Sequence, residues 1–167
     1  TDQSITDVYR CIIATALKQL LANIPGYFQH IDNPEYLHQI RVALRRMRSG
    51  LSLLQSTEQP IAISWDKSLR KIMQKLNEAR DWDVFEHEIL PDILKKMTSV
   101  SEHEPIQQAT LATIQDIAIK TRQRTQKKLH HIEFTVLILA IERHLMALSS
   151  HTEMTTKEHI QQWATKI

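Results

Sequence analysis

The side chains best placed to do chemistry are the basic ones between residues 38 and 48. His38, Arg41, Arg45 and Arg48 follow one another at spacings of three and four residues, and Arg46 flanks them. At about 100° per residue, this spacing puts the first four on one arc of a helix. No acidic residue lies between His38 and Arg48. Because arginines four residues apart on a helix repel each other, the uncompensated stripe predicts an anionic partner.

A linear polyphosphate is the partner that such a stripe suits. The planar guanidinium donates two parallel hydrogen bonds to phosphate oxygens and keeps its charge near neutral pH. Successive turns of a helix present these groups about 5 Å apart. A chain with a charge on every unit can therefore satisfy several arginines at once. The alternative is a solvated basic face whose partners lie elsewhere in the fold.

Two further basic groups are expected to extend the binding surface. The net charge is only +2, but 14 of the 21 Lys and Arg residues fall within 41–48, 67–80 and 120–128, which concentrates positive potential locally. In the second segment, Lys67, Lys71 and Lys75 point away from the apolar arc, with Arg70 at the margin. In the third, the side chains opposite the apolar arc are Lys120, Arg124, Lys127 and His131.

Other charged residues fall on the apolar arcs, where a lone charge is costly. Arg80 and Asp83 are three residues apart, and we expect them to form a structural ion pair that fixes helix register. Arg122 and Arg143 lie on or near the apolar arc of their segment and are expected to reach between helices. Asp81 is placed to orient an arginine of the 38–48 stripe.

The sequence lacks the residues of a metal centre or a catalytic site. There are nine histidines, but no HExxH pattern or cysteine-rich spacing accompanies them. No phosphate-binding glycine loop, nucleophile elbow or clear pair of carboxylates is present. The sequence therefore predicts a non-catalytic protein without a cofactor or metal.

The composition predicts an all-α protein built from long antiparallel helices. Two glycines and five prolines leave few turn residues for a β fold. Asn33 before Pro34 is expected to cap a helix, while Pro25-Gly26 and Pro91 are expected to end or kink others. The expected helices span residues 5–22, 34–55, 65–90, 106–148 with a bend, and a loosely packed 149–167 around Ile160 and Trp163.

Apolar periodicity predicts the buried face of each central helix. The expected core positions are Leu37, Ile40, Leu44, Met47, Leu51 and Leu54, then Leu69, Ile72, Met73, Leu76 and Val84, and finally Ile114, Ala118, Leu129, Ile132 and Val136.

The whole chain, residues 1–167, is expected to form one soluble domain. Its longest apolar run, from Phe134 to Ile141, is too short to cross a membrane. The lone Cys11 is expected to be buried as a small hydrophobe, so no disulfide is implied and a cytoplasmic location is expected. A chain that starts with Thr1 is expected to be an excised piece of a longer protein.

Two landmarks in the sequence resemble one family. The segment His38-Gln-Ile-Arg41-Val-Ala-Leu-Arg45-Arg46-Met-Arg48, followed by an apolar run, is similar to the H-x-x-R-x-x-x-R-R-x-R pattern of CHAD (conserved histidine α-helical) domains. The segment Asn77-Glu-Ala-Arg80-Asp81-Trp-Asp83-Val84 resembles the R-D-x-D-V that ends a helix downstream in that family. A weaker similarity extends over residues 122–148, so the resemblance covers most of the chain.

The resemblance implies antiparallel helical bundles around a basic groove that binds inorganic polyphosphate, with His38, Arg41, Arg45, Arg46 and Arg48 facing the ligand. The family usually repeats a basic motif in its second half, and residues 144–167 do not supply it. Half of the expected site is therefore missing, which raises the alternatives of weak binding or of homo-oligomers that rebuild the groove. The resemblance also allows an attached CYTH-type triphosphatase domain that this chain would regulate.

Two other functions fit parts of the pattern. A histidine phosphotransfer module would use His38 as phosphoacceptor, with Arg41 as the basic residue that follows it, but Val42 is larger than the small residue expected next. A nucleic-acid-binding domain would also need basic clusters. The basic stripe, however, has no aromatic side chain beside it for stacking on bases.

Overall fold

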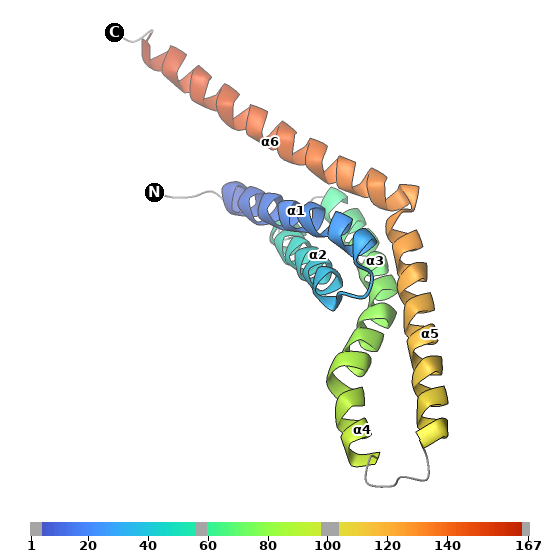
Figure 1. Cartoon of the computed structure of the whole chain (residues 1–167). Coiled ribbons are helices and arrows are strands. Elements are labelled where there is room, and N and C mark those ends of the chain that lie inside the picture. Colours follow the sequence, from blue (N-terminus) through green and yellow to red (C-terminus); the bar gives the residue numbers. More distant parts are fainter. Residues whose placement is uncertain (1–4, 56–59, 98–103, 165–167) are drawn as a thin grey trace.

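The described part of the chain is helical throughout, with no β-strand. The computed structural model describes residues 5–55, 60–97 and 104–164. Figure 1 shows the elements in chain order, with α4 and α5 forming an arm and α6 passing over α1. The elements are α1 (Ile5–Gln29), α2 (Pro34–Gln55), α3 (Pro60–Val84), the π-helical turn η1 (Phe85–Ile89), α4 (Leu90–Met97), α5 (Glu104–Leu129) and α6 (Ile132–Ala164). The all-α prediction is confirmed.

Helix α1 continues through Pro25, where the sequence predicted an end or a kink near residue 22. Proline removes one backbone hydrogen bond and crowds the preceding turn. Burial of Tyr27, which is 1% exposed, on the far side of the proline offsets this cost. The helix ends at Gln29, three residues after Gly26, whose carbonyl accepts a hydrogen bond from the His30 N–H at 2.8 Å.

Helix α2 has the predicted bounds, cap and buried face. The Asn33 side chain accepts a hydrogen bond from the Glu35 N–H at 3.0 Å, which satisfies one free amide of the first turn. Gly50 lets α2 approach α1, because a Cβ there would lie 2.8 Å from Ile13 Cδ1. The side chains predicted to form the core are at most 1% exposed at Leu37, Ile40, Leu44, Met47 and Leu51; Leu54 lies outside the described side chains.

The segment predicted as one helix from 65 to 90 begins earlier and changes its winding before Pro91. The turn from Phe85 to Ile89 is π-helical, and the N–H of Leu90 donates to the carbonyl of Phe85. A wider turn accommodates a residue that cannot donate a backbone hydrogen bond and that crowds the turn before it. The proline therefore widens the helix where a kink or end was expected.

The long segment 106–148 breaks at His130 and His131. The Phe134 N–H donates to the His131 carbonyl at 2.9 Å, which starts α6 in a new direction. The break shifts the helical phase, so the predicted core positions Ile132 and Val136 are 67% and 57% exposed. The buried face of α6 instead comprises Phe134, Leu137, Ile138, Ile141 and Leu145.

One core joins α1, α2, α3, α5 and α6. Its buried members include Tyr9, Leu20, Leu44, Leu76 and Ile141. Leu69 is fully buried as predicted, and Ile72 and Met73 pack against this core. Cys11 lies outside it and is exposed, contrary to expectation, because it lines an open groove between α1 and α6. Among the described residues, no helix is long and apolar enough to cross a membrane.

Residues 149–164 continue α6, where the sequence predicted a separate helix. The expected contacts of Ile160 and Trp163 lie outside the described side chains.

His144 helps to attach α6 to the rest of the bundle. Its ring packs edge-on against Trp65 of α3, with centroids 5.2 Å apart, and against Tyr9 of α1 at 6.1 Å. Burial lowers the pKa of His144 below its ordinary value of 6.5, because the charged imidazolium is poorly solvated there.

We expect this contact to make stability depend on pH. Since the folded state resists protonation of His144, the unfolded state binds the proton more readily, and the free energy of unfolding falls as pH drops through about 6.5. Urea denaturation at pH 8, 7, 6 and 5.5 measures this slope. His144→Phe keeps an aromatic ring without a charge and should flatten it, whereas His30→Asn, at an exposed histidine, should not. Equal slopes in all three proteins would contradict the assignment.

Candidate anion-binding site

The basic stripe of α2 faces α3 across a polar hollow. This hollow has a volume of about 300 Å³ and is lined by Arg45, Arg48, Ser49, Ser52, Asp66 and Arg70. Three guanidiniums and one carboxylate give the hollow a net charge of +2. We call it the α2–α3 hollow.

Asp66 fixes two of the three arginines. Its Oδ1 accepts a hydrogen bond from Arg48 Nε at 2.7 Å, and its Oδ2 lies 3.3 Å from Arg70 Nη2. The prediction that nothing neutralises the stripe therefore needs correction at Arg48, because the acid comes from another helix. Arg45 is exposed and forms no ion pair with any described residue, so positive charge remains in excess.

Arg41 lies farther along the same side of α2. Its Nη1 donates to Asn77 Oδ1 of α3 at 2.8 Å. Partial burial lowers the pKa of Arg41, and the charges of Arg80 and Arg45 add to this effect, while Asp81 opposes it. The sequence predicted that Asp81 orients an arginine of this stripe. In the structure, Asp81 stabilises the charge of Arg41, while Asn77 makes the hydrogen bond. His38, one turn earlier, is half-buried.

The structure does not bring all of the predicted site residues together. The side chain of Arg46 points toward α1 and not toward the α2–α3 hollow, and its Nη1 donates to Gln19 Oε1 at 2.6 Å. Arg70 lines the α2–α3 hollow and Lys67 is exposed next to Asp66, but Lys71 and Lys75 line a different hollow, where α3 meets α5 and α6. That second hollow also contains Lys128 and His131. Lys128 was absent from the predicted site, because only the packing of α5 against α3 and the position of α6 bring it beside Lys71 and Lys75.

The basic residues of α5 lie away from the α2–α3 hollow. Thr121 and Thr125 are buried, whereas Arg124 and Lys127 are exposed on the other side of the helix. Lys120 Nζ lies 2.6 Å from Asp116 of the same helix. A ligand-binding role for Lys120, Arg124 and Lys127 stays a prediction.

The predicted ion pair of Arg80 with Asp83 is replaced by two other pairs. Arg80 Nη2 lies 3.4 Å from Glu88 across the π-helical turn. Asp83, which is 2% exposed, receives a hydrogen bond from Arg122 Nε of α5 at 2.8 Å. The expectation that Arg122 reaches between helices is confirmed, and its buried guanidinium displaces Arg80 as the partner of Asp83.

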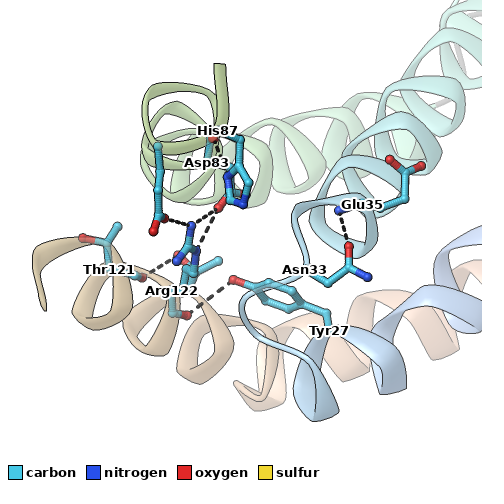
Figure 2. Close-up of polar contacts among 9 residues, drawn as sticks. Tyr27, Asn33, Glu35, Asp83, His87, Thr121 and Arg122 are labelled. Carbon is cyan, nitrogen blue, oxygen red and sulfur yellow. Dashed lines mark hydrogen bonds and ion pairs between the residues drawn. The ribbon is translucent and has the colours of Figure 1, made fainter. Parts of the chain in front are cut away.

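Arg122 is the centre of a buried polar network (Figure 2). Its guanidinium also donates to Glu86, which the π-helical turn places beside Asp83. Its carbonyl lies 3.4 Å from the Tyr27 hydroxyl of α1, and Gln126 donates to the Tyr27 carbonyl at 2.8 Å. The guanidinium of Arg122 therefore joins α5 to the end of α3 and to η1, while its backbone carbonyl meets α1.

The electrostatics of this network favour the charged guanidinium. Burial alone would lower the pKa of Arg122, but hydrogen bonds to Glu86 and Asp83 outweigh it and raise that pKa. Burial raises the pKa of Asp83, although Arg122 opposes the shift. Burial, with the charge of Asp83, also raises the pKa of the Tyr27 hydroxyl. The hydrogen bonds of this network connect α1, α3, η1 and α5. Among the described residues, no group of three or more His, Cys, Asp and Glu could hold a metal ion.

Comparison with known proteins identifies similar chains. The sequence profile of the CHAD domain matches residues 11–166. The crystal structure of the CHAD domain from the plant Ricinus communis superposes with a TM-score of 0.70 at 23% identity, which shows a shared fold. The match covers 96% of this chain and 54% of the plant chain, so this chain spans about half of that length. A comparison with curated proteins gave no match.

Removal of one side of the buried pair should be costly. Arg122→Met leaves Asp83 buried without its cation, and we expect the free energy of unfolding to fall by about 3 kcal/mol or more. Arg122→Met/Asp83→Leu removes both charges and should recover most of that loss. Urea denaturation followed by circular dichroism compares the two variants. A double variant as unstable as the single one would contradict an uncompensated charge as the cause.

Proposed function

From the premise that this chain belongs to the CHAD domain family, we propose that it binds inorganic polyphosphate at the α2–α3 hollow and catalyses no reaction. One observation carries the proposal: Arg45, Arg48 and Arg70 converge on a hollow that holds a single carboxylate. A polyanion supplies the negative charge that the fold itself does not.

Preorganisation supports phosphate binding at this place. Asp66 holds Arg48 and Arg70 in fixed positions, so a ligand does not have to order both side chains when it binds. Arg45 is exposed beside them and available to the ligand. Guanidiniums bind phosphate oxygens through paired, charge-assisted hydrogen bonds, which gives geometric selectivity beyond charge alone.

The basic surface continues from the hollow along both helices. Arg41, one turn from Arg45 on α2, is held by Asn77 and is half-buried. Lys67, next to Asp66 on α3, is exposed. A linear polymer that follows these residues meets a cation about every turn, whereas a single phosphate ion would contact only the hollow. Polymer length should therefore strengthen binding.

We expect Arg45→Gln/Arg70→Gln to lose polyphosphate affinity by about tenfold or more, because two charged hydrogen-bonding groups are removed. Arg48 and Asp66 remain paired, so the fold is retained. Isothermal titration of long-chain polyphosphate at physiological salt measures the loss. Arg10→Gln/Lys18→Gln removes the same charge from α1 and serves as the matched control, with affinity within about twofold of the wild type. Equal losses in both variants would reduce the site to a general cationic surface.

Single-stranded DNA of matched charge tests the nucleic-acid alternative. Weak, steeply salt-dependent DNA binding beside strong polyphosphate binding supports the proposal. Equal affinity for both polymers, or none for polyphosphate, contradicts it.

A further inference from the structure

A second basic hollow lies at the corner where α5 ends and α6 begins. Its volume is about 300 Å³. Lys71 and Lys75 come from α3, Lys128 comes from the last turn of α5, and His131 comes from the break before α6. Phe134 and Leu137 provide apolar walls. We call it the corner hollow.

The three lysines of the corner hollow have no acidic partner among the described residues. Lys71, Lys75 and Lys128 form no ion pair with any described residue. The one carboxylate that lines the hollow, Glu133, is 79% exposed and lies 3.8 Å from His131 Nδ1. Three lysines and one carboxylate give the corner hollow a net charge of +2, even when His131 is neutral. Lys71 and Lys75 are one turn apart and repel each other without a ligand.

The corner hollow and the α2–α3 hollow lie on different sides of α3. Asp66 and Arg70 face α2, whereas Lys71 and Lys75 face α5 and α6. The exposed surface between them carries Lys67, and Arg70 and Lys71 are consecutive residues. A flexible polyanion can therefore pass from one hollow to the other around a single helix, whose diameter is about 10 Å.

The two hollows differ in the phosphate chemistry that they suit. The α2–α3 hollow presents planar guanidiniums, whereas the corner hollow presents ammonium groups, which are compact charges that donate in any direction. Helices α3, α5 and α6 wall the corner, and the side chains of Phe134 and Leu137 line its apolar part. A terminal phosphate carries up to about two negative charges near neutral pH, while an internal unit carries one. Because helices α3, α5 and α6 wall the corner and its ammonium groups donate in any direction, it suits a compact, doubly charged group from which no chain continues.

We propose that the corner hollow binds the terminal phosphate of a polyphosphate chain whose inner units occupy the α2–α3 hollow. The inference rests on the proposed function for the path of the chain, but the corner hollow is testable by itself. It assigns Lys75, Lys128 and His131 to recognition of the chain end.

Short polyphosphates with free ends and with chemically blocked ends separate end binding from general attraction. Lys75→Gln/Lys128→Gln should weaken binding of the free-ended polymer by about tenfold and leave the end-blocked polymer within about twofold. Lys18→Gln/Lys96→Gln, which removes two exposed lysines elsewhere, should change neither. An equal loss for both polymers, or no loss for the free-ended one, overturns the proposal.

Tripolyphosphate, in which most units are ends, tests the corner independently of the long chain. We expect it to shift the His131 imidazole signals in NMR spectra of the wild type and of Arg45→Gln/Arg70→Gln, and to leave them unmoved in Lys75→Gln/Lys128→Gln. If long polyphosphate fails to bind but this shift occurs, the proposed function fails while the corner site stands. If long polyphosphate binds without any His131 shift, the corner site fails alone.

Discussion

The buried guanidinium of Arg122 is the interaction on which the arrangement of the helices depends. It sits between Asp83 and Glu86, and the carbonyl of the same residue meets Tyr27. A charge at this depth is tolerated only with its acids in place. That requirement fixes α5 against the end of α3, and separate hydrogen bonds of Tyr27 with the Arg122 carbonyl and with Gln126 attach α1 (Figure 2). The π-helical turn before Pro91 belongs to the same constraint, because it aligns the two carboxylates.

Once α3 is fixed, it determines where positive charge gathers. On one side of α3, Asp66 pairs with Arg48 of α2. On another side, Lys71 and Lys75 line the corner hollow. Figure 1 shows the corner between α5 and α6 to which this hollow belongs. Asp66 removes one charge from the α2–α3 hollow but orders two guanidiniums. Under the proposed function, fewer net charges and ordered donors would favour phosphate geometry over indiscriminate attraction.

Local sequence patterns predicted the features that depend only on residues within one helix. The cap at Asn33, the bounds of α2 and the burial of Leu44 and Met47 follow from spacing and from proline and asparagine chemistry. Prediction failed where the helical phase changes, since Ile132 and Val136 were placed on an arc that assumed one continuous helix. It also failed at Cys11, because residue type cannot tell which side of an apolar helix finds a partner.

By itself, the sequence determined that the chain is helical, that α2 carries an apolar side and a basic side, and that two landmarks match one family. Those features depend on periodicity within one segment. Only the tertiary structure decided that Arg48 meets Asp66, that Asp83 pairs with Arg122 instead of Arg80, and that Lys128 joins Lys71 and Lys75. These partners are 18, 39 and more than 50 residues apart in the chain. Contacts between helices depend on crossing angles and on the break at His130, which no local spacing encodes.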